Sequence, residues 1–394
     1  MLYPRKIYEK IKDGFLEEKK EFVVLTGARQ VGKTSILVML KEYLEEKGNS
    51  CYYFNLENPE YFESFKEHPF NIFEYIDEAK AKQYVFLDEI QYLPDPSNFL
   101  KLLYDEKGDK IKIIATGSSS FYIDNKFKDS LVGRKFLFEV FPLSWEEFLI
   151  FNERGDLVEK SSLKTKDYKD LEELWSAYIT YGGYPKVSLA GDNDLKKIYL
   201  EEIGSSYIKK DIREAGVKNQ AKYFNLMRIL ADQTGSLVNA SELADSLDIA
   251  VKTVEEYLYV MSKSYHLSFI RPFYKNIRKE LTKMPKVYFF DLGLRNFFLN
   301  NFEKIEKRND KGAYLENIFF LYLLRAKGGA DKINFWRTQD KKEVDFVTDN
   351  EAYEIKFDSK KIRESGYQKF KESYPEKEFE IVSYEDCKKK FFEK

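Results

Sequence analysis

The sequence is poor in cysteine and histidine, and it lacks long apolar runs. Its 394 residues include 2 cysteines, Cys51 and Cys387, and 2 histidines, with no CxxC pair. A disulfide framework and a thiolate zinc site are therefore not expected. No apolar run approaches the roughly 20 residues of a membrane span, and the N-terminus lacks a secretory apolar segment. We therefore expect a cytoplasmic protein that does not enter a membrane.

An excess of basic residues is also absent. Lysine and arginine number 65 against 67 aspartate and glutamate residues, which gives a formal net charge of −2. Any contact with nucleic acid must therefore be a local basic patch. The chain is instead rich in aromatic residues, with 29 Tyr and 33 Phe, which favours packed domains over disorder. Its length predicts about two to four domains.

Short apolar runs alternate with helical patterns in the first 150 residues. Strands that alternate with helices predict a parallel sheet covered by helices on both faces, and hence an α/β fold. The predicted strands are residues 22–26, 51–54, 84–88, 111–115 and 136–141.

A glycine-lysine loop follows the first predicted strand and opens a predicted helix. Its sequence, GARQVGKT, fits the P-loop pattern G-x-x-x-x-G-K-[ST], in which backbone N–H groups cradle phosphates. Lys33 can reach the β- and γ-phosphates of ATP, the Thr34 hydroxyl can bind Mg²⁺, and Arg29 is expected to brace the loop. The predicted nucleotide-binding residues of the loop are Gly27, Ala28, Arg29, Gln30, Val31, Gly32, Lys33, Thr34 and Ser35.

An acidic pair ends the third predicted strand, in the segment YVFLDEIQYL. Asp88 and Glu89 lie roughly 50 residues after the loop. At such a position an aspartate holds Mg²⁺, and the following glutamate orients or deprotonates the attacking water. We therefore predict Asp88 as a magnesium ligand together with Thr34, Glu89 as the catalytic base, and ATP and Mg²⁺ as cofactors.

Two further segments have both a functional and an ordinary interpretation. Thr116 or Ser118, in IIATGSSS, could sense the γ-phosphate, or could only mark the exit from a strand. Arg134, in LVGRKF, could act as an arginine finger on the nucleotide of a neighbouring subunit, or could be a surface arginine. The first interpretation of Arg134 predicts a homo-oligomer.

Five segments together resemble the AAA-type ATPases: GARQVGKTS, FLDEIQ, ATGSSS, LVGR and YGGYP. The resemblance is to a group of archaeal and bacterial ATPases with a winged helix and a C-terminal restriction-endonuclease-like domain, and it extends over nearly the whole chain. It implies four domains: an AAA-like ATPase core at 1–150, a helical lid and connector at 151–217, a winged helix at 218–300 and an endonuclease-like α/β domain at 301–394.

The winged-helix prediction depends on two short helical patterns and a basic segment. Ser241 could cap the helix ELADSLDI, and a turn leads into VKTVEEYLYVMSKS. Between Arg271 and Lys286 the chain has six basic residues and one acid, which would suit contacts with DNA phosphates. Glu255 and Glu256 in the second helix would repel DNA. Both DNA contact and a purely structural role therefore stay open.

The segment KKEVDFVTDNEAYEIKF predicts a hairpin that carries carboxylates. Strand alternation would place Asp345 beside Glu354 and Lys356. Two such carboxylates can bind a divalent metal, and a lysine beside them can position or activate water. The order of the surrounding elements resembles the restriction-endonuclease fold, and that resemblance implies Glu316, on the preceding helix, as a further metal ligand. The alternative is a solvated charged face.

The sequence thus predicts an ATPase that couples hydrolysis to the binding or processing of DNA. A metal-dependent nuclease site, with Lys356 as a catalytic residue, would lie in the C-terminal domain. The alternative is a nucleotide-gated signalling switch, in which an inactive nuclease-like domain docks a partner or DNA.

Overall fold

The computed structural model describes residues 3–17, 20–77, 82–117, 133–160, 164–273, 283–358 and 364–393. These residues form two compact units. The first comprises Met1–Leu143 together with Lys263–Tyr265, and the second comprises Ser144–Ser262 together with His266–Lys394. Among the helices of this described part, none is long and apolar enough to cross a membrane.

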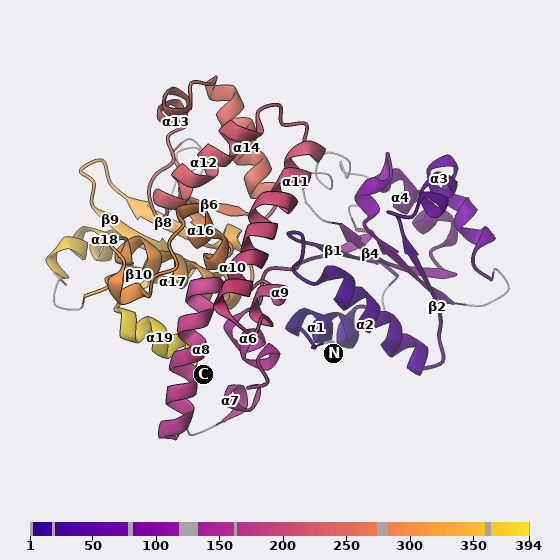
Figure 1. Ribbon diagram of the computed structural model, residues 1–394, viewed down its shortest axis with the longest axis horizontal. Coiled ribbons are helices and arrows are strands. Elements are labelled where there is room, and N and C mark those ends of the chain that lie inside the picture. The colour runs from indigo at the N-terminus through magenta and orange to yellow at the C-terminus, as the bar shows by residue number, and fades with distance from the viewer. Residues whose placement is uncertain are drawn as a thin grey trace. The chain divides into compact units, whose positions relative to one another are not determined.

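A parallel five-stranded sheet forms the centre of the first unit (Figure 1). Its strand order is β2-β3-β4-β1-β5. Every residue of β1, β3 and β4 is buried, as is typical of inner parallel strands. The predicted α/β fold is confirmed. The strands are β1 (Phe22–Thr26), β2 (Ser50–Asn55), β3 (Gln83–Asp88), β4 (Ile111–Gly117) and β5 (Lys135–Glu139).

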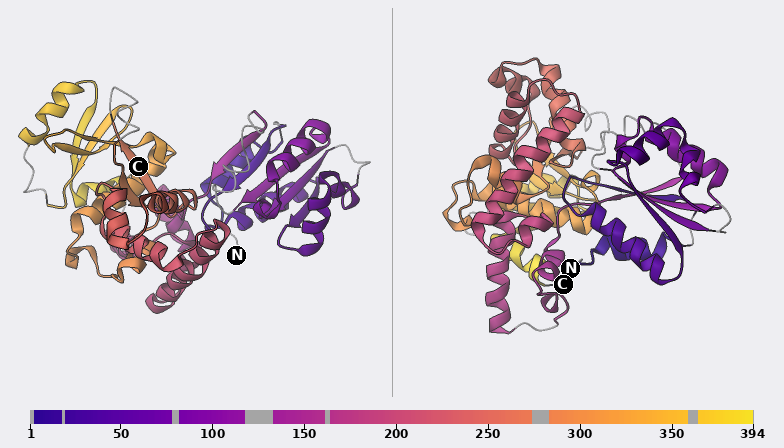
Figure 2. Two further views of the ribbon diagram at one scale, coloured as in Figure 1. Left: turned by 90° about the horizontal axis from the view of Figure 1, so that it is seen from above. Right: turned by 45° about the vertical axis from the view of Figure 1, so that its right-hand side comes forward.

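Helices cover both faces of this sheet. Figure 1 shows α1 and α2 on one side and α3 and α4 on the other, and Figure 2 (right) shows the strands between the two layers. Phe65, Phe99 and Leu103 of α3 and α4 pack against the strands in one apolar cluster. The helices are α1 (Lys6–Gly14), α2 (Lys33–Glu46), α3 (Pro59–Glu67) and α4 (Pro96–Lys107), with 3-10 turns at Pro69–Glu74 and Ile90–Tyr92.

The second unit contains a mixed six-stranded sheet with the order β11-β10-β9-β8-β6-β7. The pairs β10·β11 and β6·β8 are parallel, and the other three pairs are antiparallel. The expected hairpin is β9 and β10, in which Tyr353 pairs with Phe346. The strands are β6 (Leu267–Pro272), β7 (Lys286–Phe289), β8 (Asn334–Arg337), β9 (Glu343–Val347), β10 (Glu351–Ile355) and β11 (Glu378–Val382).

Helices make up most of the rest of the second unit. From residue 144 to 299 they are α6 (Trp145–Phe151), α7 (Asp156–Glu159), α8 (Thr165–Tyr181), α9 (Pro185–Ser188), α10 (Asn193–Glu201), a π-helix (Glu202–Tyr207), α11 (Ile208–Glu214), α12 (Gln220–Asp232), α13 (Ala240–Leu247), α14 (Val251–Lys263) and α16 (Leu292–Leu299). Beyond them lie α17 (Lys311–Lys327), α18 (Gln368–Ser373) and α19 (Tyr384–Phe392), with 3-10 turns at Ile305–Lys307, Ala330–Lys332 and Glu364–Tyr367.

The C-terminal strands are packed between two helices. Phe319 of α17 makes aromatic contacts with Phe346 of β9 and Tyr353 of β10. Phe370 of α18 lies instead in an apolar cluster with Val347 and Ala352. Successive side chains of a strand point to opposite faces, so α17 and α18 cover different faces of the hairpin.

The region predicted as a winged helix has three helices, α12 to α14, followed by the antiparallel pair β6 and β7. Strand β6 also pairs with β8, so the sheet continues across the boundary expected at residue 300. One local expectation was wrong. Asn239, and not Ser241, caps α13, because its side-chain oxygen accepts the backbone N–H of Ser241 at 3.1 Å.

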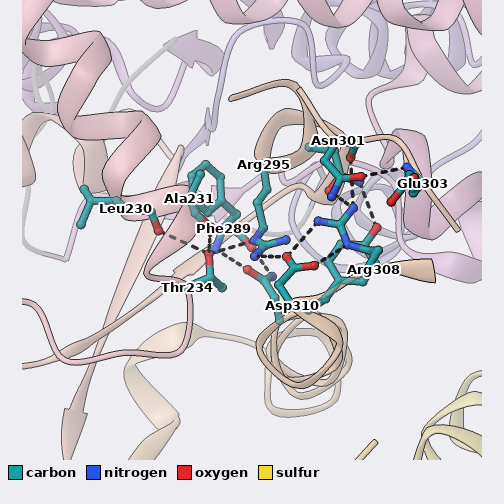
Figure 3. A network of polar contacts seen from close by, with 12 residues as sticks. Leu230, Ala231, Thr234, Phe289, Arg295, Asn301, Glu303, Arg308 and Asp310 are labelled. Carbon is teal, nitrogen blue, oxygen red and sulfur yellow. Dashed lines mark hydrogen bonds and ion pairs between the residues drawn. The ribbon is translucent and has the colours of Figure 1, made fainter. Parts of the chain in front are cut away.

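A buried ionic network joins several helices of the second unit (Figure 3). Asp310, which precedes α17, accepts from Arg295 at 2.7 Å and from Arg308 at 2.8 Å. Arg295 also donates to Thr234, which follows α12, at 2.9 Å. Both guanidinium groups lie against the ring of Tyr314. One partly exposed carboxylate therefore pairs with two fully buried arginines.

Candidate nucleotide site and C-terminal carboxylate cluster

The glycine-lysine loop joins the end of β1 to the start of α2. Two of its residues need glycine. Gly32, at the N-cap of α2, has a φ of 95°, and a Cβ on Gly27 would lie 2.0 Å from the carbonyl oxygen of Val140. A side chain at either position would be strained or would clash. The loop backbone is thus held against the sheet, with the positive end of α2 at its edge.

Lys33 lies inside the loop. Its ammonium donates to the carbonyl oxygens of Gly27 at 2.8 Å and Ala28 at 2.7 Å, and the residue is 6% exposed. The positive charge is therefore placed at the centre of the loop, where a phosphate group would be bound.

Asp88, the last residue of β3, is held by hydroxyl groups. Its Oδ2 accepts from Thr34 at 2.9 Å and from Tyr53 at 2.8 Å, and its Oδ1 accepts from Thr116. Among the described residues, no lysine, arginine or histidine forms an ion pair with it. The carboxylate is therefore buried without a cation of its own.

Glu89 turns the chain away from β3. Its φ of 59° is left-handed, its backbone N–H donates to the Thr116 hydroxyl at 3.0 Å, and its carboxylate accepts from Gln91. The predicted acidic pair thus lies at the carboxyl end of the sheet together with Thr34 and Thr116. Ser118, the other predicted sensor, lies outside the described residues.

These residues fit ATP and Mg²⁺. A hydroxyl and a carboxylate, from Thr34 and Asp88, are oxygen ligands of the kind that Mg²⁺ prefers, and among the described residues the buried Asp88 carboxylate accepts its hydrogen bonds from hydroxyl groups. Bound Mg²⁺ would supply positive charge against the phosphate oxygens of the nucleotide. Lys33 and the loop amides would hold those phosphates.

Arg134 lies at the end of the sheet where β1 begins, opposite to the end that carries the glycine-lysine loop. It precedes β5, its carbonyl oxygen accepts from the N–H of Phe22 at 2.8 Å, and Phe22 is the first residue of β1. The loop follows the last residue of β1, about 16 Å farther along the strand. The guanidinium pairs with Asp105 at 2.8 Å. Arg134 therefore lies far from the loop of its own chain, and a role on a neighbouring subunit stays a prediction.

Tyr53 is a site residue that the sequence analysis missed. It lies near the end of β2, and its hydroxyl shares Asp88 Oδ2 with Thr34. Burial, followed by the hydrogen bond to Asp88, raises the pKa of Tyr53, so the hydroxyl stays a donor. The carboxyl ends of parallel strands meet at one edge of the sheet, and this signal could have indicated a polar residue at the end of β2.

The predicted C-terminal carboxylates do come together. Glu316 of α17 and Asp345 of β9 are both within 4 Å of one ammonium, that of Lys286 in β7. Asp345 Oδ2 also accepts the N–H of Ile355 at 2.9 Å, and Glu354 pairs with Lys356. The four residues implied by the endonuclease resemblance thus lie in one region of the second unit.

Lys286 is the unexpected member of this region. It is 2% exposed, and its Nζ lies 2.6 Å from Glu343 Oε1, 3.3 Å from Asp345 Oδ1 and 3.7 Å from Glu316 Oε2. A divalent metal with these ligands would occupy the same position. Among the described residues, no group of three or more His, Cys, Asp or Glu side chains is arranged to hold a metal. As they lie, these carboxylates do not fit a nuclease-type metal.

Burial shapes the chemistry of the same carboxylates. Desolvation, followed by the charge of Asp345, raises the pKa of Glu316 to about 8 and that of Glu354 to about 7. Each of these acids is therefore partly protonated near neutral pH, and a protonated acid is a poorer metal ligand.

Comparison with known families assigns the first unit to a class. Residues 19–149 match the AAA domain family, which agrees with the loop, the acidic pair and the parallel sheet. This segment is therefore similar to AAA domains, and the first unit has the fold of P-loop ATPases. Residues 172–305 and 311–391 match two families, each described as a domain of unknown function (DUF8612 and DUF4143).

Individual relatives match most of the chain. An uncharacterized protein of Haemophilus influenzae is 28% identical over 335 residues, which cover 82% of this chain and 78% of the relative. An uncharacterized protein of Methanocaldococcus jannaschii is 27% identical over 341 residues, which cover 84% of this chain and 73% of the relative.

Solved structures with some similarity include DNA replication proteins. The Orc1 protein of Aeropyrum pernix, in complex with DNA, has a TM-score of 0.33 and 14% identity, and covers 75% of this chain and 91% of its own. AMPPCP-bound DnaA of Aquifex aeolicus has a TM-score of 0.32 and 16% identity, with coverages of 65% and 86%.

Proposed function

We propose that this protein hydrolyses ATP with Mg²⁺ and couples hydrolysis to the binding or processing of DNA. The observation that carries the proposal is the 2.9 Å hydrogen bond between Thr34 Oγ1 and Asp88 Oδ2, beside the ammonium of Lys33. A metal hydroxyl and a phosphate-binding lysine at the start of α2 are brought together with a metal carboxylate at the end of β3.

Each residue then has a defined task. Lys33 and the amides of the loop bind and orient the phosphates, and Thr34 and Asp88 hold the metal. Glu89, at the same end of the sheet, orients the attacking water and accepts its proton. Thr116 donates to Asp88 and accepts the N–H of Glu89, so it fixes the two acids relative to each other.

The ATPase is tested by turnover measurements on single variants. We expect Lys33→Ala and Asp88→Asn each to lower ATP turnover by about 10²-fold or more, since each removes a group that stabilises transition-state charge. Lys41→Ala is the matched control, because Lys41 lies on the same helix but pairs with Glu45 on its surface. Lys33→Ala with full nucleotide affinity and turnover would sink the proposal.

The DNA part of the proposal is supported by the second unit. The order α12-α13-α14-β6-β7 suits a winged helix, and the order α17-β8-β9-β10-α18-β11, with Asp345 and Glu354 on adjacent strands and Lys356 directly after the second of them, suits an endonuclease-like domain. Against direct reading by α14, Glu255 and Glu256 are exposed on it. These charges therefore favour contact of the second unit with the DNA phosphate backbone over recognition of the base sequence by α14.

The coupling is tested with linear, single-stranded and four-way DNA. Turnover is measured with and without each DNA, in Mg²⁺ and in Mn²⁺, while gels report cutting. Stimulation by at least one DNA is the expected result. Turnover that no DNA changes would contradict the coupling and leave the ATPase intact.

The second candidate is a nucleotide-gated switch whose C-terminal domain docks a partner without cutting. Lys286 among the carboxylates specifically favours it, because a filled cluster does not need a metal. Slow turnover near ~0.01 s⁻¹, unaffected by DNA, is the behaviour expected of such a switch. In either case, an arginine finger at Arg134 predicts that turnover rises with protein concentration and that Arg134→Ala removes this rise.

A further inference from the structure

The C-terminal carboxylate cluster consists of Glu316, Glu343, Asp345 and Glu354. One ammonium, Lys286 Nζ, lies within 4 Å of the first three of these acids, and its aliphatic chain is buried from solvent. The ammonium also lies 5.6 Å from the centroid of the Phe335 ring, on its face. A lysine is almost never buried in this way unless it is paired, so the cluster and the lysine require each other.

The charges of the cluster come close to balance without a metal. The four carboxylates carry at most four negative charges. Three cations face them: Lys286 among three acids, Arg337 on Glu343 and Lys356 on Glu354. One residual negative charge remains, and it disappears when one carboxylate is protonated. A divalent ion added to this arrangement would leave an excess of buried positive charge.

The coordination capacity of the acids is also largely used. Both oxygens of Asp345 are engaged, one by Lys286 and one by the N–H of Ile355. Glu316 Oε2 accepts from the Tyr288 hydroxyl at 3.1 Å. Within the described residues, Glu354 Oε2 is a buried oxygen that has no hydrogen-bond partner. A metal entering the cluster would therefore have to displace the ammonium of Lys286.

We infer that Lys286 takes the place of the divalent cation, so that the cluster binds no metal while this lysine is present. The second unit then keeps the strand arrangement of a nuclease-type site but holds it together with an internal ion pair. In consequence, removal of the lysine charge opens a cation site, and the wild-type cluster cuts no DNA in Mg²⁺ or Mn²⁺.

The test measures Mn²⁺ binding by electron paramagnetic resonance, without nucleotide, in the full chain. All proteins carry Asp88→Asn, which removes the carboxylate of the nucleotide site as a competing ligand. We expect Lys286→Met to bind one more Mn²⁺ per chain than the background protein, with at least tenfold higher affinity, and to lose that ion again when Asp345→Asn is added. Lys377→Met, which removes a charge that donates to the backbone carbonyls of Thr348 and Asp349 and lies over the ring of Phe273, should gain no ion.

Stability supplies a second readout, because Lys286→Met leaves three carboxylates without their cation. At a Mn²⁺ concentration of 100 times Kd, ion binding should raise the Tm of this variant by about 5–10 °C and leave the Tm of the Lys377→Met control unchanged. If Lys286→Met does not fold without metal, Mn²⁺ should restore its fold. Lys286→Arg keeps the charge and should exclude Mn²⁺.

Three results would overturn the inference. The first is a Mn²⁺ ion bound by the background protein and lost on Asp345→Asn, or DNA cutting by the wild-type protein that Asp345→Asn abolishes. The second is a folded Lys286→Met variant with no additional ion. The third is a Lys286→Met variant that stays unfolded in millimolar Mn²⁺. None of these results bears on ATP hydrolysis, since nucleotide is absent from the binding assay.

Discussion

Asp88 in the first unit and Asp345 in the second are both buried carboxylates on strands, but they are satisfied in opposite ways. Asp88 accepts hydrogen bonds from hydroxyl groups, whereas Asp345 pairs with the ammonium of Lys286 and accepts a backbone N–H. A hydroxyl group can turn and become a metal ligand itself. An ammonium already supplies the charge that a metal would bring. The first carboxylate is therefore prepared for an external cation, and the second is not.

A second buried ionic network of the same unit follows the pattern of Asp345. Arg295 and Arg308 are fully buried, and both pair with Asp310 (Figure 3). Burial raises the pKa of Asp310, but the hydrogen bonds and charges of the two arginines outweigh burial and hold that pKa at about 2. This network and the Lys286 cluster have opposite charge arrangements. Asp310 is one anion between two cations, whereas Lys286 is one cation among three acids.

Among the variants that test this comparison, Asp310→Ala is expected to change the free energy of unfolding the most. Removal of the shared carboxylate leaves two buried guanidinium groups without a counter-charge, which should lower the free energy of unfolding by about 3–5 kcal/mol. Denaturant unfolding of the full chain, followed by a probe in the second unit, checks this value. Glu306→Ala, a nearby exposed position, should change it by no more than about 0.5 kcal/mol. A loss below about 1 kcal/mol for Asp310→Ala would show that the network does not depend on its one anion.

The contrast also explains how far the sequence alone can predict this molecule. The P-loop and the acidic pair are local patterns, and their context of strand and helix is visible within a few residues. The hairpin of β9 and β10 is local as well, and it brings Asp345 and Glu354 to adjacent strands, with Lys356 directly after β10. Their role as a nuclease-type site stays a prediction. These predictions needed only short-range geometry.

The role of Lys286 could not be predicted in this way. In the sequence it is the last of six basic residues in a segment for which DNA contact and a structural role both stayed open. Its burial depends on how β7 packs beside α17 and near β9, which join residues far apart in the chain. Tyr53 was missed for a related reason, because its partner Asp88 lies on the neighbouring strand, 35 residues away. Contacts between elements that are far apart in the sequence decide which polar residues lie together. Local sequence patterns do not predict these contacts.

A second prediction concerns Asp291, a buried carboxylate for which the described part of the chain supplies neither a hydroxyl partner nor a cation. It accepts the N–H groups of Gly183 and Leu294, and burial raises its pKa to about 6. Since the pKa of an unfolded aspartate is about 3.9, the folded protein binds more protons between pH 4 and 6. Asp291 should therefore destabilise the fold as the pH rises through this window, by about 3 kcal/mol in total.

The measurement is the free energy of unfolding at several pH values, for the wild-type chain and for Asp291→Asn. Asparagine caps a helix about as well as aspartate and does not titrate, so the difference between the two proteins isolates this group. The stability of the variant relative to wild type should increase from pH 4 to pH 6 and then stay constant. Parallel curves would show that Asp291 keeps an ordinary pKa despite its burial.

The smallest effect, and the closest test of how Asp88 is held, is Tyr53→Phe. The variant removes one donor to a carboxylate and leaves Thr34 and Thr116 in place. A hydrogen bond to a charged group contributes about 1.5–3 kcal/mol. Since two donors remain, we expect ATP turnover to fall about tenfold or less, with a higher Mg²⁺ concentration needed for half-maximal activity.

Tyr52→Phe is the matched control for this prediction. Tyr52 is the preceding residue of β2, its side chain points to the other face of the strand, and its hydroxyl accepts the N–H of Asp77 at 3.3 Å. Its loss should leave the Mg²⁺ dependence unchanged. If Tyr53→Phe shifts stability but not the Mg²⁺ dependence, then Tyr53 supports the strand and not the metal carboxylate. In that case Asp88 is positioned by the threonines alone, and the preparation of this carboxylate for a cation depends on α2 and β4 without β2.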